Sequence, residues 1–234
     1  MSKKGTICII FSFFLVLVFS GWAWGLRLSN DQVYGYNCVR LLSSNNRIGK
    51  KVALTFDDVP NMYTQKILKI LRTYRVKATF FLVGYQVKKN PDSAREIIHY
   101  GHELGNHSYT HRWSGENTVD NLLRDIDRAE KCIVDITGHM PLYLRPPGGL
   151  IDEDVKKACG QSGYGIVLWT VDSRDWFYSD DRDTILKNVL DHVKDGSIIL
   201  FHSLPQTVDV LPEVIETLQD RGYQIGSVSS ILNQ

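Results

Sequence analysis

Short apolar runs alternate with helical patterns through most of this chain, and this alternation constrains its fold more than any other feature. Seven strand-like runs are recognisable: Val52–Asp58, Ala78–Gly84, Glu103–Ser108, Tyr143–Pro147, Gly165–Asp172, Ser197–His202 and Gln224–Val228. Six helical patterns lie between or beside them: Thr64–Tyr74, Asp92–Gly101, Val119–Thr137, Asp152–Cys159, Thr184–Lys194 and Leu211–Arg221. Strands that alternate with helices predict a parallel sheet in an α/β fold. Because seven strands approach the eight of a closed barrel, we expect barrel-like closure rather than an open sheet.

The bulk composition is that of an ordinary globular domain. The 234 residues are 43% hydrophobic and 23% charged, and the formal net charge is +1. A chain of this length can bury a full core. Its near-neutral charge, with acids and bases interspersed, favours neither nucleic acid nor an acidic membrane surface as a partner.

The N-terminus differs from the rest of the chain. Lys3 and Lys4 precede an apolar stretch from Thr6 to Leu26, and Ala23-Trp-Gly25 resembles a small-residue cleavage site. We therefore interpret residues 1–25 as a signal peptide or, because the stretch could cross a bilayer, an uncleaved membrane anchor. Both interpretations place the remaining chain outside the cytoplasm, either secreted or anchored to the outer face of the cell membrane. The Ser- and Asn-rich residues 26–50 are interpreted as a linker to a domain at 51–234.

Two adjacent acids, Asp57 and Asp58, end the first apolar run. Buried strands do not carry unpaired acids for stability, since such a burial costs several kcal/mol (roughly). Neighbouring residues of a regular strand point to opposite faces. The pair therefore suggests one acid on a metal and the other free for proton transfer, with an Asp-rich turn as the alternative.

Other polar residues also fall at strand ends, where the carboxyl-terminal face of an α/β barrel carries its chemistry. The six are Asp57, Asp58, His107, Arg145, Asp172 and His202. His107 and His111 are four residues apart, a spacing that places two imidazoles on one face of a helical turn. With one aspartate they form a set of two nitrogens and one oxygen, suited to zinc or another divalent transition metal.

The other histidines are expected to be surface or capping residues: His99, His102, His139 and His192.

Five segments, in this order, resemble the motifs of the polysaccharide deacetylases, known as carbohydrate esterase family 4 or the NodB homology domain. They are Thr55-Phe-Asp-Asp-Val-Pro60, His107-Ser-Tyr-Thr-His111, Arg145-Pro-Pro-Gly-Gly149, Asp172-Ser-Arg-Asp-Trp176 and Leu200-Phe-His202. The resemblance covers about residues 51–232. It implies a distorted (β/α)7 barrel in a single domain, and metal-dependent hydrolysis of acetyl groups on a sugar polymer.

The resemblance also implies a role for each matching residue. Asp58, His107 and His111 would bind the metal, with Zn²⁺ favoured and Co²⁺, Ni²⁺ or Mn²⁺ as alternatives. Asp57 would be the general base that deprotonates the attacking water, oriented by Arg145. The general acid would be His202, with Asp175 beside it. Trp176 and Leu200 would line the acetyl pocket, and a backbone N–H near Gly148 would help to bind the oxyanion.

This chain departs from the family pattern at two positions. Val59 stands where the family usually has glycine, and a positive φ there would strain valine by roughly 1–2 kcal/mol; we expect a negative φ. Gly148 stands where the family usually has an aromatic residue, which predicts a wider or differently shaped cleft.

Together these features predict an exported, monomeric, metal-dependent deacetylase acting on an acetylated glycan, with no nucleic acid partner. Peptidoglycan amino sugars are the leading substrate, followed by chitin-type oligomers and then acetylated xylan. Two alternatives stay open. One is a metal-dependent hydrolase of another non-peptide C–N bond on the same fold, and the other is a non-catalytic wall-binding protein.

Overall fold

The computed structural model describes residues 38–39, 50–114 and 117–232. The predicted signal or anchor at 1–25 lies outside these residues, as does most of the interpreted linker at 26–50. Within the described part of the chain, no helix is both long and apolar enough to span a bilayer.

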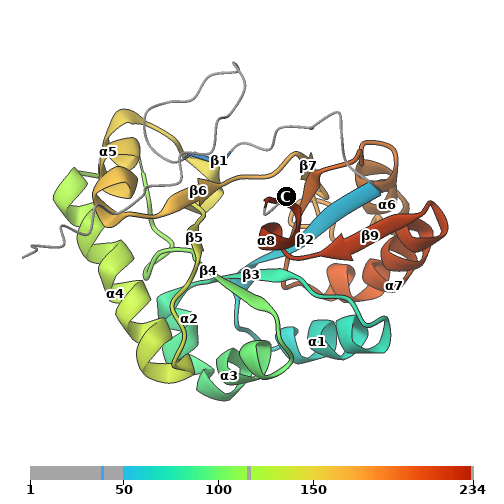
Figure 1. The fold of residues 1–234 in the computed structure, drawn as a ribbon, viewed down its shortest axis with the longest axis horizontal. Coiled ribbons are helices and arrows are strands. Elements are labelled where there is room, and N and C mark those ends of the chain that lie inside the picture. The colour runs from blue at the N-terminus through green and yellow to red at the C-terminus, as the bar shows by residue number, and fades with distance from the viewer. Residues whose placement is uncertain (1–37, 40–49, 115–116, 233–234) are drawn as a thin grey trace, which may run out of the picture. The chain divides into compact units, whose positions relative to one another are not determined.

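A curled sheet of parallel strands organises the molecule (Figure 1). Its neighbours run in the order β1-β6-β5-β4-β3-β2-β8-β7, and β9 also pairs with β2. The strands are β1 Cys38–Val39, β2 Lys50–Val59, β3 Thr79–Leu82, β4 Glu103–Asn106, β5 Tyr143–Leu144, β6 Gly165–Val167, β7 Val171–Asp172, β8 Ser197–His202 and β9 Tyr223–Gly226. The predicted α/β class and distorted barrel are confirmed by this parallel half-barrel.

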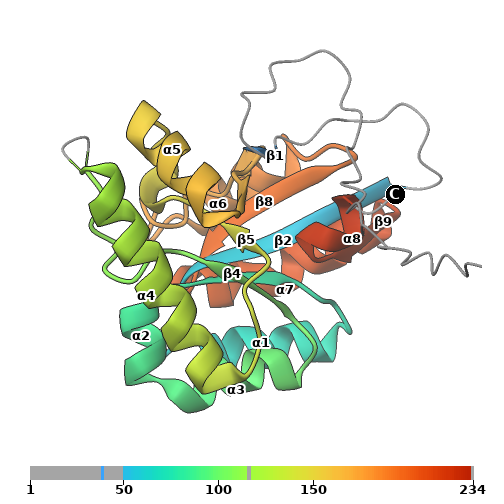
Figure 2. The same ribbon diagram turned by 60° about the vertical axis from the view of Figure 1, so that its left-hand side comes forward.

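Helices α1 to α7 lie around the outside of the curled sheet, while α8 lies near its centre (Figures 1 and 2). Their bounds are α1 Thr64–Thr73, α2 Gly84–Lys89, α3 Pro91–His99, α4 Val119–Thr137, α5 Glu153–Ser162, α6 Arg182–Leu190, α7 Pro205–Asp220 and α8 Val228–Leu232, with a 3-10 turn at Pro147–Gly149. The long helix α4 has the predicted bounds. It begins after Thr118, whose side chain accepts the Asn121 N–H, and ends at Gly138 in the left-handed region.

Side chains along β2 point alternately to the outside and the inside of the curled sheet, and so contribute to two separate parts of the core. Val52, Leu54 and Phe56 pack outward with residues of α1, α3, α6 and α7. Ala53 faces inward, in a cluster with Val228 and Ile231 of α8. Thr55 and Asp57 share the inner face with Ala53, because side chains two residues apart point the same way. The same alternation that builds the core therefore directs Asp57 into the barrel.

One predicted strand, Gly165–Asp172, is wrong as a single element. It forms two strands, β6 and β7, that pair with different neighbours. The guanidinium of Arg145 accounts for the interruption, because it binds the carbonyl oxygens of Val167 and Leu168 at 3.0 and 3.1 Å. These two bonds fall at the end of β6 and in the gap before β7.

Candidate active site

The strand β2 becomes irregular at the two acids. Its register with β3 shifts between Phe56 and Val59. Asp58 adopts a φ of 58°, in the left-handed region that aspartate tolerates better than most residues. Asp57 is 3% exposed, whereas the side chain of Asp58 is 36% exposed. The irregularity thus lets two adjacent acids serve one site from different directions.

Val59 has a negative φ, as expected, because the positive φ of this segment falls one residue earlier, at Asp58. The valine side chain is fully buried in the outer core. Its carbonyl oxygen accepts the Val83 N–H at 2.9 Å, and its peptide bond to Pro60 is cis. The departure from the family glycine therefore causes no left-handed strain at position 59.

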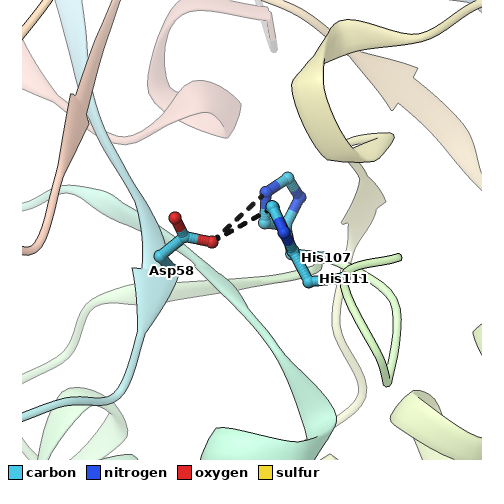
Figure 3. A group of neighbouring side chains, drawn as sticks. All are labelled: Asp58, His107 and His111. Atoms are coloured by element: carbon cyan, nitrogen blue, oxygen red, sulfur yellow. Dashed lines mark ion pairs between the residues drawn. The ribbon is translucent and has the colours of Figure 1, made fainter. Parts of the chain in front are cut away.

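Asp58, His107 and His111 gather their ligand atoms in one place (Figure 3). Asp58 Oδ1 lies 3.2 Å from His111 Nε2 and 3.9 Å from His107 Nε2, and all three ligand atoms lie within 4.8 Å of one another. Ligands at about 2.0–2.1 Å from a tetrahedral zinc ion would be roughly 3.3 Å apart. Both the donor set and the spacing fit a divalent transition metal.

The two imidazoles meet through a turn rather than the helical turn that their spacing suggested. Ser108 and His111 both have positive φ, at 64° and 54°, and the Ser108 hydroxyl accepts the His111 N–H at 3.0 Å. His107 Nδ1 lies 2.6 Å from the Arg145 carbonyl oxygen, so Nδ1 carries the proton and Nε2 is left as the ligand atom. Burial lowers the pKa of His107 despite the nearby carboxylates, which favours the neutral, metal-binding form.

Arg145 holds the other acid of the pair. It is fully buried, and its Nη1 donates to Asp57 Oδ1 at 2.7 Å and to Thr55 Oγ1 at 2.9 Å. Its guanidinium also lies 4.0 Å from the centre of the Phe81 ring. Asp57 Oδ2 points the other way and lies 3.6 Å from His107 Nε2. One oxygen of Asp57 is thus fixed by a cation while the other faces the ligand cluster.

His202, at the end of β8, pairs with Asp175. The Asp175 carboxylate is fully buried, and it accepts from His202 Nδ1 and the His202 backbone N–H, each at 2.7 Å. Burial alone would lower the pKa of His202, but the Asp175 hydrogen bond and the charges of Asp175, Asp57 and Asp58 outweigh it and raise it to about 9. His202 is therefore an imidazolium near neutral pH.

The three expected substrate contacts differ in exposure. Leu200 is 2% exposed and, by alternation, shares the inner face of β8 with His202. Trp176 is 59% exposed, directly after Asp175. Gly148 has a φ of 62°, and a Cβ placed on it would meet nothing within 4 Å. The space that an aromatic side chain at this position would fill, as one wall of the cleft, is therefore open.

Asp172, counted among the polar strand ends, caps the next turn instead: its carboxylate accepts the Arg174 N–H at 2.8 Å. His102, expected to be a surface or capping residue, is 5% exposed, and its Nδ1 accepts the Ala78 N–H at 3.2 Å.

Several supporting residues were missed from the sequence. The amide of Asn61 donates to the carbonyl oxygens of Asp58 and Ser203 at 3.2 and 2.8 Å, which links the strand end of the acids to that of His202. Asp125 of α4 accepts from Thr110 and from Trp113 Nε1 at 3.0 Å, which ties the segment around His111 to the helix. No spacing in the sequence marks these residues, because the links to Ser203 and to the segment around His111 form only once the strand ends and α4 are brought together.

A curled parallel sheet with acid, base and ligand side chains at the carboxyl ends of its strands defines an α/β-barrel hydrolase site. Comparison with known proteins narrows this class of hydrolase to one family. The family model of the polysaccharide deacetylases matches residues 44–167. A peptidoglycan-N-acetylglucosamine deacetylase of Bacillus cereus is 36% identical over 190 residues, covering 78% of this chain and 88% of that protein.

Solved structures agree with these sequence matches. The peptidoglycan deacetylase PdaC of Bacillus subtilis superposes with a TM-score of 0.74 at 35% identity, covering 79% of this chain and 91% of that chain. A CE4 family pseudoenzyme from Bacillus anthracis has the same TM-score at 33% identity, covering 79% and 66%. The chain belongs to the polysaccharide deacetylase family. The predicted enzyme class, a polysaccharide deacetylase hydrolase, is confirmed.

Proposed function

We propose that this chain is an exported, divalent-metal-dependent enzyme that hydrolyses N-acetyl groups on peptidoglycan amino sugars. The observation that carries the proposal is the convergence of three groups at one end of the sheet. These are the Asp58–His107–His111 ligand cluster, the Asp57–Arg145 pair and the His202–Asp175 pair.

The ligand cluster would hold Zn²⁺, or alternatively Co²⁺, Ni²⁺ or Mn²⁺, because two imidazole nitrogens and one carboxylate oxygen suit these ions. Such an ion supplies Lewis acidity, which polarises an acetyl carbonyl and makes water easier to deprotonate. His107 contributes a fixed tautomer, since its Nδ1–H is engaged by the Arg145 carbonyl oxygen.

Asp57 is placed to act as the general base. Arg145 donates to one of its oxygens and fixes the direction of the buried carboxylate. The free oxygen, Oδ2, faces the ligand cluster, where an attacking water would be deprotonated as its oxygen adds to the acetyl carbon.

His202 is placed to act as the general acid. Its Nδ1–H is held by Asp175, so Nε2–H is the proton available to the substrate. When the C–N bond breaks, that proton passes to the amine nitrogen, and the products are acetate and a free amino sugar. The Gly148 N–H donates no hydrogen bond within the described residues, so this N–H is able to donate to the oxyanion.

The relatives support peptidoglycan as the substrate. The Bacillus cereus relative is named for N-acetylglucosamine, whereas PdaC of Bacillus subtilis, 36% identical over 184 residues, is named for N-acetylmuramic acid. We propose that the chain acts outside the cytoplasm, secreted or held at the outer face of the cell membrane, since Lys3, Lys4 and the following apolar stretch resemble an export signal.

Acetate release tests the proposal. Purified protein is assayed on peptidoglycan, chitin-type oligomers and acetylated xylan, with and without a chelator, and with Zn²⁺ restored. We expect release from peptidoglycan that stops on chelation and returns with metal, and analysis of the product sugars assigns the amino sugar. Metal binding without acetate release on any glycan would instead support a non-catalytic wall-binding protein.

A further inference from the structure

Three adjoining hollows lie along α1 and at the amino-terminal ends of β2 and β3, and none is lined by a residue of the candidate active site. The first, of about 210 Å³, is lined by Leu71, Arg72, Arg75, Val76, Lys77, Tyr100 and His102. The second, of about 440 Å³, shares Arg72 and Tyr100 with it and continues along α1. The third, of about 380 Å³, shares Arg75 and Lys77 with it and continues to Lys51 and β9. Together they form one discontinuous groove, which we call the basic groove.

The lining of the basic groove carries charge of one sign. Its cations are Lys51, Lys66, Lys69, Arg72, Arg75 and Lys77, and no aspartate or glutamate lines any of the three hollows. This arrangement contrasts with the chain as a whole, where 27 basic and 26 acidic residues nearly balance. The local excess of positive charge is therefore a property of this face.

These cations also lack a paired carboxylate among the described residues, although Lys77 Nζ donates to the Tyr100 carbonyl oxygen. Within the described part of the chain, none of the six forms a salt bridge, whereas Arg95, Arg145, Lys156, Lys157 and Arg182 each pair with a carboxylate. Arg72 and Lys66 lie over the rings of Tyr100 and Tyr63, at 5.7 and 5.8 Å from the ring centres. Aromatic faces of this kind orient a cation without neutralising it.

The shape of the basic groove favours a chain over a flat surface. Its hollows run from α1, past the loop before β3, to the start of β2, and α1 lies beside α3 in Figures 1 and 2. The buried side chains of Leu68, Leu71 and Val76 form its floor beneath the cations. Burial, and to a lesser extent Lys77, lower the pKa of His102 to about 4, so the positive charge of the lining comes from lysine and arginine.

We infer that the basic groove binds a linear chain of polyol phosphodiesters, namely poly(glycerol phosphate). Spaced phosphates would meet successive cations along the groove. Because none of the three hollows is lined by a residue of the candidate active site, a bound polymer leaves Asp57 and His202 open to glycan.

The test is binding of poly(glycerol phosphate) to the full chain, measured by titration calorimetry or fluorescence anisotropy at about 50 mM salt and again at about 500 mM. The test variant carries Lys69→Gln, Arg72→Gln and Arg75→Gln. A matched control removes three exposed lysines on α2, α4 and α6: Lys88→Gln, Lys131→Gln and Lys187→Gln. Circular dichroism melting verifies that both variants fold.

We expect roughly a tenfold or greater loss of polymer affinity in the test variant, little change in the control, and strong weakening of wild-type binding at high salt. Equal affinity losses in the two variants would overturn the inference, because they would reflect net charge alone. Stronger binding to phosphatidylglycerol vesicles than to the polymer, lost in the test variant, would overturn it in favour of a membrane surface.

Discussion

Asp175 controls the proton that His202 would deliver, and replacing it with asparagine tests this directly. The carboxylate accepts from both the ring and the backbone of His202, and the pKa of His202 is raised from 6.5 to about 9. The Asp175→Asn substitution would remove the charge while the burial of His202, which lowers its pKa, would persist. We expect the pKa of His202 in this variant to fall below about 7.

The size of the effect follows from the titration. At pH 7.5, a group with a pKa near 9 is about 97% protonated, whereas one with a pKa near 6.5 is about 10% protonated. We therefore expect roughly a tenfold loss of kcat/KM at pH 7.5 from protonation alone. The alkaline limb of the pH profile should move toward lower pH by about two pH units, because the acid must be protonated to act.

The contribution of the His202–Asp175 pair to the free energy of unfolding should depend on pH. Because the folded pKa of His202 lies above its unfolded value, the pair stabilises the native state fully below about pH 6.5, and this contribution disappears as the pH rises through about 9. The rise of the His202 pKa from 6.5 to about 9, to which the charges of Asp57 and Asp58 also contribute, corresponds to roughly 3 kcal/mol. Chemical denaturation should therefore show a larger gap between wild type and the Asp175→Asn variant at pH 6 than at pH 10.

The assay combines an NMR titration of the His202 ring in metal-free protein with the pH profile of the metal-loaded enzyme. Thr207→Val is the control, because it removes a hydroxyl that donates to Asp175 Oδ2 but keeps the carboxylate charge. A folded Asp175→Asn variant whose His202 still titrates near 9 would refute the reasoning.

Three further predictions test the other parts of the site. Asp57→Asn should abolish acetate release but retain metal measured by atomic emission, and wild-type turnover in that variant would rule out its role as base. Asp125→Asn should weaken metal affinity about tenfold in a competition titration, because it loosens the segment around His111, while exposed Asp127→Asn on the same helix should change nothing. Gly148→Tyr should lower stability by roughly 1 kcal/mol, because position 148 has a positive φ, and should alter relative kcat/KM across acetylated glycans. Unchanged preference in Gly148→Tyr would show that the open position does not shape the cleft.

The sequence alone was sufficient to predict the parallel α/β fold and to place the reactive residues at strand ends. Both follow from local physics, since apolar alternation and helix boundaries depend on neighbouring residues. Helix α4 has its predicted bounds for this reason. The short helix α2 was missed, because six residues beginning at a glycine carry too little periodic pattern.

Tertiary structure decided how the residues act. The sequence showed two adjacent acids, but the φ of 58° at Asp58 and the buried guanidinium of Arg145 divide them between the ligand cluster and an ion pair with Arg145. Arg145 also divides the predicted strand at Gly165–Asp172, by binding carbonyl oxygens more than 20 residues away. The fixed tautomer of His107, the raised pKa of His202 and the basic groove likewise depend on partners distant in sequence. Chemical identity and local periodicity are written in the sequence, whereas hydrogen-bond direction, burial and electrostatic environment exist only once the chain has folded.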